Sequence, residues 1–195
     1  MELESYRPYF LDTKADTTTL EPDISARIEE VRAKSGFVPN VFMTLALRPN
    51  EFRAFFAYHD ALMAKVSGLS KAEREMIVVV TSAANDCMYC VVAHGAILRI
   101  HSKNPRLSDQ IATNYRLAEL SERETAICSF ALKVASSAHA IDGVDYALLH
   151  NHGLSDDDIW DVGAIAAFFA LSNRLAGFTQ MVPNQEFYLM GRVPR

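Results

Sequence analysis

Apolar residues recur at every third or fourth position along most of the chain, which is the period of an amphipathic α-helix. Between Glu51 and Gly68, for example, the apolar side chains trace a single helical face, and His59 lies on it. The same period returns after each break in the pattern. Residues that precede the periodic segments predict helices beginning near Asp23, Asn40, Glu51, Ser70, Asn85–Asp86, Ser108, Ser121, Asp142 and Ser155. The pattern therefore predicts an all-α fold class.

One segment is open to a second interpretation, because residues 77–81 form a β-branched run that would also suit a strand. Ser70 and Glu73 have the spacing of a capping box, which marks the start of a helix just before this run. Ala83 and Ala84 continue the helical pattern after it, and no apolar segment of similar character offers itself as a pairing strand. We therefore predict a helix from Ser70 onward.

Two segments of the chain resemble each other and suggest an internal repeat of a helix pair. Leu69-Ser70 with Arg74-Glu75 is echoed by Leu120-Ser121 with Arg123-Glu124. Two unrelated capping boxes explain the echo equally well, because such boxes are common at helix starts.

Length and composition predict a single globular domain over residues 1–195, with residues 1–22 as an N-terminal extension and residues 182–195 as an aromatic, irregular C-terminal tail. The chain has 195 residues, half of them hydrophobic, and a net charge of −5. It lacks a Lys or Arg cluster, which argues against nucleic acid or an anionic membrane as partner. Because the N-terminus lacks the basic and apolar regions of a secretory signal, and no eighteen apolar residues run uninterrupted, we expect a soluble, cytoplasmic protein.

The candidate chemistry lies in the sequence Cys87-Met88-Tyr89-Cys90, with Glu75 before it and His94 after it. A helix starting at Asn85–Asp86 would place Cys87 in its first turn, where free backbone amides stabilise a thiolate. His94 would lie one helical turn after Cys90, close enough to exchange a proton with that sulfur. Glu75 lies in an apolar run that would remove it from water and suit it to proton transfer. These residues predict a reversible dithiol–disulfide centre.

Other interpretations of these residues remain open. A zinc site could use Cys87, Cys90 and His94 with a fourth ligand such as His101 or Cys128, although a second cysteine knuckle is missing. Covalent haem attachment is excluded because valine, not histidine, follows Cys90. An oligomeric redox sensor, in which disulfide formation repacks helices without turnover, is an alternative to an enzyme, and a general dithiol–disulfide oxidoreductase is an alternative to a peroxidase. We expect His59 to be a core histidine and Cys128 a small buried hydrophobe.

The pattern of Glu75, the dithiol and His94 is similar to the active-site pattern of the alkylhydroperoxidase D-like branch of the carboxymuconolactone decarboxylase superfamily, and most of all to its peroxidase-related proteins. Further segments resemble landmarks of that family and span most of the chain: Gly36-Phe37-Val38-Pro39-Asn40, Arg48-Pro49, Gly68-Leu69-Ser70 with Glu73-Arg74-Glu75, and Pro183-Asn184 with Glu186-Phe187. The resemblance implies an alkylhydroperoxidase D-like helical bundle and a peroxidase that needs no haem, flavin or metal.

The resemblance also implies roles for the residues. Cys90 would attack a hydroperoxide, Cys87 would resolve the sulfenic acid to a disulfide, and Glu75 with His94 would relay protons. A dithiol reductant, lipoyl or thioredoxin-like, would restore the thiols, and the protein would form homo-oligomers, either dimers or assemblies of trimers. The predicted position of Cys87 in the first turn of a helix instead indicates that Cys87 is the more acidic of the two thiols.

The chain departs from the family pattern at Tyr89, where the best-known members carry a second histidine. A tyrosine can donate a hydrogen bond, and we count Tyr89 as a supporting residue, but its reference pKa of about 10 prevents proton relay near pH 7. Decarboxylation of a lactone is not expected, because that branch of the superfamily does not rely on a cysteine pair.

Overall fold

The computed structural model describes residues 17–192, and within this range every regular element is a helix. Short 3-10 turns accompany the α-helices. The elements in chain order are η2 (Thr17–Thr19), α1 (Pro22–Ser35), α2 (Asn40–Leu45), α3 (Pro49–Met63), α4 (Lys71–Ala84), α5 (Met88–Ser102), α6 (Leu107–Asn114), η3 (Tyr115–Leu117), α7 (Glu122–Ser137), η4 (Ala138–Ala140), α8 (Gly143–Asn151), α9 (Asp156–Phe178) and α10 (Gln185–Leu189). The all-α prediction is confirmed. The predicted N-terminal extension lies mostly outside the described residues.

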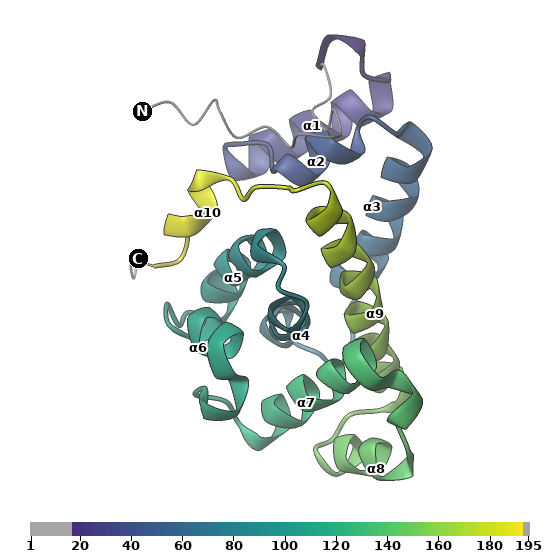
Figure 1. The fold of residues 1–195 in the computed structure, drawn as a ribbon, viewed down its shortest axis with the longest axis vertical. Helices are drawn as coiled ribbons and strands as arrows, with labels where there is room; N and C mark the ends of the chain where they lie inside the picture. The colour runs from purple at the N-terminus through teal and green to yellow at the C-terminus, as the bar shows by residue number, and fades with distance from the viewer. Residues whose placement is uncertain (1–16, 193–195) are drawn as a thin grey trace.

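Helix α4 is the central element of the bundle. Figure 1 shows it end-on in the middle, surrounded by α5, α6, α7 and α9, and it packs against all four of them. Its residues 73–82 are all buried, which explains the continuous apolar run there. Helices α1, α2 and α3 lie at one end of the molecule and α8 at the other (Figure 1). The helical interpretation of residues 77–81 is therefore correct.

The predicted capping boxes form as expected. The Ser70 hydroxyl accepts the Glu73 N–H at 3.1 Å, and the Glu73 carboxylate accepts the Ser70 N–H at 2.7 Å. Ser121 and Glu124 make the same pair of bonds at the start of α7. The arginines of the two similar segments do not occupy equivalent positions relative to the capping boxes. Arg74 follows the glutamate of its capping box, whereas Arg123 precedes the glutamate of its own. The internal repeat stays a prediction.

The predicted boundaries of three elements are wrong. The dithiol helix does not begin at Asn85–Asp86, because Asp86 has a left-handed backbone with φ of 50° and Cys87 is the N-cap. Helix α3 begins at Pro49 rather than Glu51, since proline suits the first helical turn, where its missing N–H costs nothing. It ends at Met63 rather than continuing to Gly68, and Val66 is exposed in the loop that follows. The C-terminal tail is not wholly irregular, since it contains α10.

Tertiary contacts hold α10 in place. The guanidinium of Arg99 on α5 donates to the carbonyls of Phe187 and Met190, each at 2.9 Å. The Phe187 ring packs edge-on against Phe37 with centroids 5.0 Å apart. The C-terminal segment therefore packs against α5, and Phe187 belongs to the buried cluster that contains Cys87 and Cys90.

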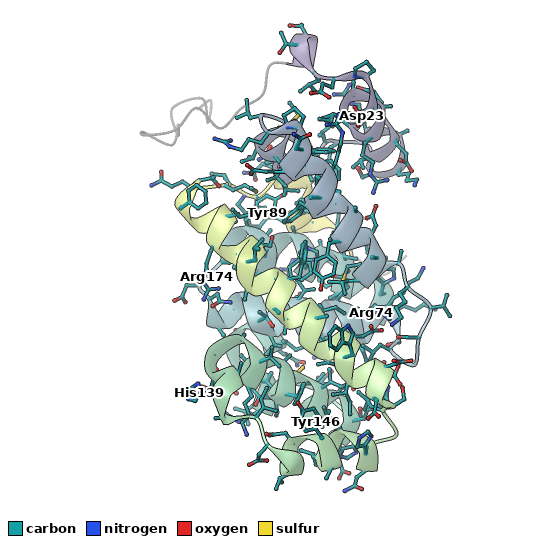
Figure 2. All side chains as sticks on the ribbon, turned by 90° about the vertical axis from the view of Figure 1, so that its right-hand side faces the viewer. Asp23, Arg74, Tyr89, His139, Tyr146 and Arg174 are labelled. Carbon is teal, nitrogen blue, oxygen red and sulfur yellow. The ribbon has the colours of Figure 1, made fainter. Side chains whose placement is uncertain are left out.

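Helix α9 is the only described helix long and apolar enough, by length and composition, to cross a membrane. However, 56% of its apolar window is buried inside the bundle, and the buried acids Asp158 and Asp161 lie in its first half. Asp161 forms an ion pair with the buried Arg74 at 3.1 Å. In Figure 2, α9 crosses the middle of the visible face diagonally, with the labelled Tyr89 near its C-terminal part. These contacts are those of a core helix in a soluble helical domain.

Candidate active site

The turn between α4 and α5 brings both thiols of the dithiol segment into the protein interior. Cys87 is the N-cap of α5, where its N–H donates to the carbonyl of Ser82 at 2.9 Å, and Cys90 follows in the first turn. Cys87 is 5% exposed and Cys90 2% exposed, and neither is in a disulfide. The spacing therefore places two reduced sulfurs on one buried face, with Cys87 nearer to the surface.

The two thiols interact and share a proton unequally. A hydrogen bond from the Cys90 thiol lowers the pKa of Cys87 to about 7, although burial opposes the shift. The same interaction, together with burial, raises the pKa of Cys90. Because the pair titrates as a unit, its singly charged form has the thiolate on Cys87 and the remaining proton on Cys90. The prediction that Cys87 is the more acidic thiol agrees with this direction.

Glu75 and His94 form a buried pair beside the dithiol. The Nδ1 atom of His94 lies 2.8 Å from Oε2 of Glu75, and their side chains are 14% and 8% exposed. The His94 ring packs edge-on against Phe169 of α9, with centroids 4.7 Å apart. Within residues 17–192 no hydrogen bond joins His94 to a sulfur, but the imidazole acts on Cys87 electrostatically. The structure thus brings Glu75, His94 and the dithiol into one region.

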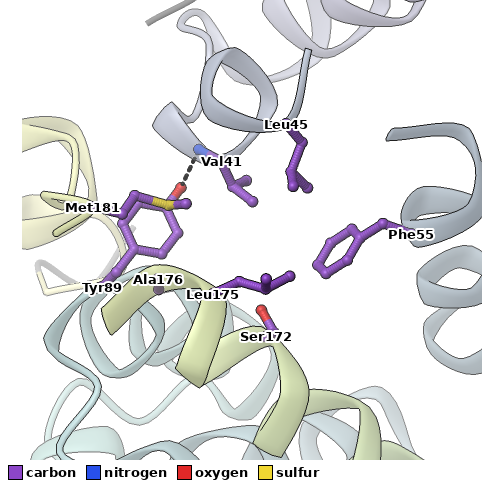
Figure 3. Close-up of a pocket in the computed structure, with 8 residues that line it drawn as sticks. All are labelled: Val41, Leu45, Phe55, Tyr89, Ser172, Leu175, Ala176 and Met181. Atoms are coloured by element: carbon purple, nitrogen blue, oxygen red, sulfur yellow. Dashed lines mark hydrogen bonds between the residues drawn. The ribbon is translucent and has the colours of Figure 1, made fainter. Parts of the chain in front are cut away.

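Tyr89 points away from this pair and towards α2. Its hydroxyl accepts the N–H of Val41 at 3.1 Å, and burial raises its pKa far above the neutral range. Figure 3 shows this bond as the link between α5 and α2. In this position Tyr89 connects two helices and has no contact through which it could relay protons to Glu75 or His94.

We therefore expect Tyr89→Phe to leave the chemistry of the dithiol nearly unchanged while lowering stability. The Val41 N–H loses its acceptor, which should reduce the free energy of unfolding by about 1 kcal/mol. Chemical denaturation measures this loss, and the pH at which the thiols titrate serves as the control. A large change in thiol titration with unchanged stability would contradict the structural role.

A small apolar recess lies next to Cys90, between α2, α3, α9 and the start of the C-terminal segment (Figure 3). It encloses roughly 220 Å³, including its opening to solvent. The Ser172 hydroxyl is its polar element on α9 and lies 3.9 Å from the Cys90 sulfur. The lining residues are Val41, Leu45, Phe55, Tyr89, Ser172, Leu175, Ala176 and Met181. A small apolar molecule in this recess would approach the dithiol from the side of Cys90.

Comparison with known proteins places the chain in a family. Residues 49–111, which contain Glu75, both thiols and His94, match the model of the Carboxymuconolactone decarboxylase family. A crystal structure from Ralstonia eutropha JMP134, described as an alkylhydroperoxidase AhpD core and an uncharacterized peroxidase-related protein, is 59% identical over 93% of this chain and 95% of that one, with a TM-score of 0.92. The chain belongs to the alkylhydroperoxidase D-like proteins of this family.

Other alkylhydroperoxidase D-like and related folds are similar to it. An uncharacterized peroxidase-related protein from Silicibacter sp. TM1040 is 40% identical over 93% of this chain and 95% of that chain, with a TM-score of 0.88. The debrominase Bmp8, 20% identical over 91% of this chain and 94% of its own, has the same fold with a TM-score of 0.77. None of the curated proteins matches the chain.

In this alkylhydroperoxidase D-like chain, the sequence prediction missed two residues of α9 that reach the dithiol. Ser172 and Asn173 are 8% and 3% exposed. Asn173 donates to the Ser82 hydroxyl at 2.9 Å and accepts from the Asn85 side chain at 3.0 Å. The signal that could have found them is a pair of polar residues in an otherwise apolar stretch of a helix.

The residues of the alternative zinc site are not arranged as a set of metal ligands in the described part of the chain. In the described part of the chain, no group of three His, Cys, Asp or Glu side chains is placed to hold a metal ion. Cys128 is fully buried in the main core, where burial raises its pKa to about 12, and it does not belong to the cluster around the dithiol. His101 is exposed near the end of α5. His59 is half-buried rather than a fully buried core residue, and it contacts Asp60 and the rings of Phe168 and Phe169.

Proposed function

We propose that the protein is a thiol-dependent peroxidase that reduces hydroperoxides through a Cys87–Cys90 dithiol–disulfide cycle. The observation that supports this most is the combination of two interacting buried thiols with the hydrogen-bonded Glu75–His94 pair. A thiolate is the nucleophile that opens a peroxide bond, and an acid nearby is needed to protonate the leaving oxygen. The peroxidase-related relatives are consistent with such an antioxidant role.

The cycle begins with the single proton that the two thiols share. Cys90 passes its proton to the Cys87 thiolate as the peroxide approaches, and the Cys90 sulfur attacks the terminal peroxide oxygen. The O–O bond breaks, Cys90 becomes a sulfenic acid, and the leaving alkoxide takes a proton from the Glu75–His94 pair to form an alcohol. The Cys87 sulfur then attacks the Cys90 sulfur, the S–O bond breaks, and a disulfide and water are formed.

An external dithiol completes the cycle. One of its sulfurs attacks the disulfide and forms a mixed disulfide with one cysteine; the second sulfur then attacks this mixed disulfide, displaces the cysteine as a thiol, and the reductant leaves as a disulfide. This exchange returns both cysteines to their starting state and gives one proton back to Glu75–His94. Cys87 suits the exchange because it is the less buried of the two sulfurs and caps the end of a helix. We propose a lipoyl or thioredoxin-like dithiol as the reductant.

The assignment of peroxide attack to Cys90 is supported by the position of the recess. Its polar residue, Ser172, touches the Cys90 sulfur, and the remaining lining is mostly apolar. The closed part of the recess has room for about one water-sized molecule. It suits hydrogen peroxide better than an organic hydroperoxide with a long chain.

The test is steady turnover of the reduced protein with cumene hydroperoxide or hydrogen peroxide, regenerated by dihydrolipoamide. We expect many equivalents of peroxide to be consumed per protein chain, with the disulfide as an intermediate. Consumption of a single equivalent, accompanied by a change in assembly state, would contradict the peroxidase and support the redox-sensor alternative. Size-exclusion chromatography of the reduced and oxidised protein distinguishes these outcomes.

A further inference from the structure

Asn173 is held by other side chains in a position where its amide nitrogen faces the dithiol. The carbonyl of Thr81 accepts from Nδ2 of Asn85 at 3.1 Å, and a carbonyl can only accept. Nδ2 of Asn85 therefore points towards Asn173, where it donates to Oδ1 at 3.0 Å. This chain of bonds fixes which end of the Asn173 amide is the carbonyl and which is the NH₂ group.

The NH₂ group of Asn173 has two hydrogens and one oxygen partner. One N–H donates to the Ser82 hydroxyl at 2.9 Å, which leaves the second for the sulfurs at the start of α5. Asn173 is a hydrogen-bond partner of both thiols: it adds to the lowering of the Cys87 pKa, and at Cys90 it opposes the larger effects of Cys87 and burial, which raise the pKa overall. Asn173 is 3% exposed, so water does not compete for this donor.

We propose that Asn173 is a further catalytic residue, which donates a hydrogen bond to the thiolate of the Cys87–Cys90 pair and stabilises its negative charge. This inference rests on the proposed function, in which a thiolate carries out the chemistry. An amide is a neutral donor and cannot itself take up the proton that is shared between the sulfurs. The charge can thus move from one sulfur to the other while the same donor stays within reach.

Few other groups around the sulfurs stabilise a thiolate, and one of them is the backbone N–H of Cys90, which also lowers the pKa of Cys87. The titratable side chains of this region are Glu75 from α4, Tyr89 and His94 from α5, Asp86 in the turn between the two helices, and His59 from α3, which interacts with the Glu75–His94 pair. Tyr89 bonds to Val41, and His94 bonds to Glu75. The α9 residues that reach the sulfurs, Ser172 and Asn173, are not titratable. No lysine or arginine is among the groups that shift the two thiols, so the thiolate depends on neutral donors and His94.

The test is the pH dependence of thiol alkylation by iodoacetamide, followed by mass spectrometry of the whole protein. In the parent, alkylation should rise as the pH passes through about 7, because the thiolate exists above the pKa of Cys87. In Asn173→Leu the midpoint should move to higher pH by about one unit, which makes the thiolate fraction at pH 7 about fivefold smaller. This readout needs no peroxide, so it holds or fails independently of the proposed peroxidase activity.

A second variant covers the case in which Asn173→Leu does not fold. Asn173→Asp keeps the shape, can accept from Asn85, and can accept from Ser82 once its hydroxyl turns. It replaces the donor facing the sulfurs with an anion, so the midpoint should rise further than in Asn173→Leu. The control is Asn184→Leu, since Asn184 bonds to the backbone of Val38 and Asn40 and not to the sulfurs. The control should lose thermal stability with an unchanged midpoint; a folded Asn173 variant with the parental midpoint would overturn the proposal.

Discussion

Replacement of Cys90 with serine is expected to reduce hydroperoxide turnover to the uncatalysed rate, whereas replacement of Cys87 should stop the cycle one step later. Without the Cys90 sulfur, nothing next to the recess can attack the peroxide. Without the Cys87 sulfur, Cys90 still forms a sulfenic acid, but no partner converts it to a disulfide. Both variants should fold, because serine fits the space left by the thiol and can keep a hydrogen bond to its neighbour.

Mass spectrometry before and after one equivalent of cumene hydroperoxide, with dimedone as a trap for sulfenic acid, measures this difference. We expect a trapped adduct on Cys90 in Cys87→Ser and no adduct on Cys87 in Cys90→Ser. An adduct found only in Cys90→Ser would reverse the two roles, in line with the lower pKa of Cys87. Cys128→Ala is the matched control, since Cys128 is buried in the main core, and it should turn over at the parental rate.

The two roles follow from different properties of two sulfurs that touch each other. Acidity favours Cys87, because the Cys90 thiol donates to it and lowers its pKa. Access to the recess favours Cys90, because its sulfur lies 3.9 Å from the hydroxyl of Ser172, which is one of the lining residues. A proton shared along one hydrogen bond reconciles them, since the thiolate can form on either sulfur without a proton entering from water.

The helical fold could be predicted because its signals are local. The Ser70 and Ser121 capping boxes need only residues within one helical turn, and both form as expected. The continuous apolar run of α4 was ambiguous in the sequence because a helix buried on all sides has no polar face to reveal its period. Its central position among four helices explains that ambiguity.

The boundaries and contacts that depend on distant parts of the chain could not be predicted in this way. Asp86 would have been a good helix start, but the N–H of Cys87 bonds back to Ser82 at 2.9 Å and Asp86 takes a left-handed turn. The α10 helix is fixed by Arg99, which is far away in sequence. Asn173 reaches the dithiol only through the packing of α9 on α4 and α5.

The position of Tyr89 shows how a departure from a family pattern can be interpreted once its contacts are known. From the sequence, a tyrosine in place of a histidine cast doubt on proton transfer at this position. In the structure its hydroxyl bonds to the backbone of Val41, while Glu75 and His94 pair with each other at 2.8 Å. The candidate proton path is therefore short and has no place for a side chain at position 89.

A large effect is also expected for Glu75→Gln, which should lower the rate of sulfenic acid formation by about 100-fold or more. General acid–base groups typically contribute about 10² to 10⁴ to a rate, and glutamine cannot hold or release a proton. Its amide oxygen can still accept from Nδ1 of His94, so the imidazole should keep its place and the fold should be preserved. Stopped-flow measurement of the first oxidation, over a range of pH, tests this expectation.

The matched control for Glu75→Gln is Glu73→Gln, which makes the same chemical change two residues earlier in α4. Glu73 is also buried, but it caps the helix through Ser70 and pairs with Arg123 at 2.7 Å, away from the thiols. Its replacement should lower the melting temperature and leave the oxidation rate near that of the parent. If Glu75→Gln oxidises at the parental rate at every pH, Glu75 does not supply the proton, and a group outside the Glu75–His94 pair must protonate the leaving oxygen. Reduction of a preformed disulfide by dihydrolipoamide should be affected much less, because a thiolate is a better leaving group than an alkoxide and depends less on an acid.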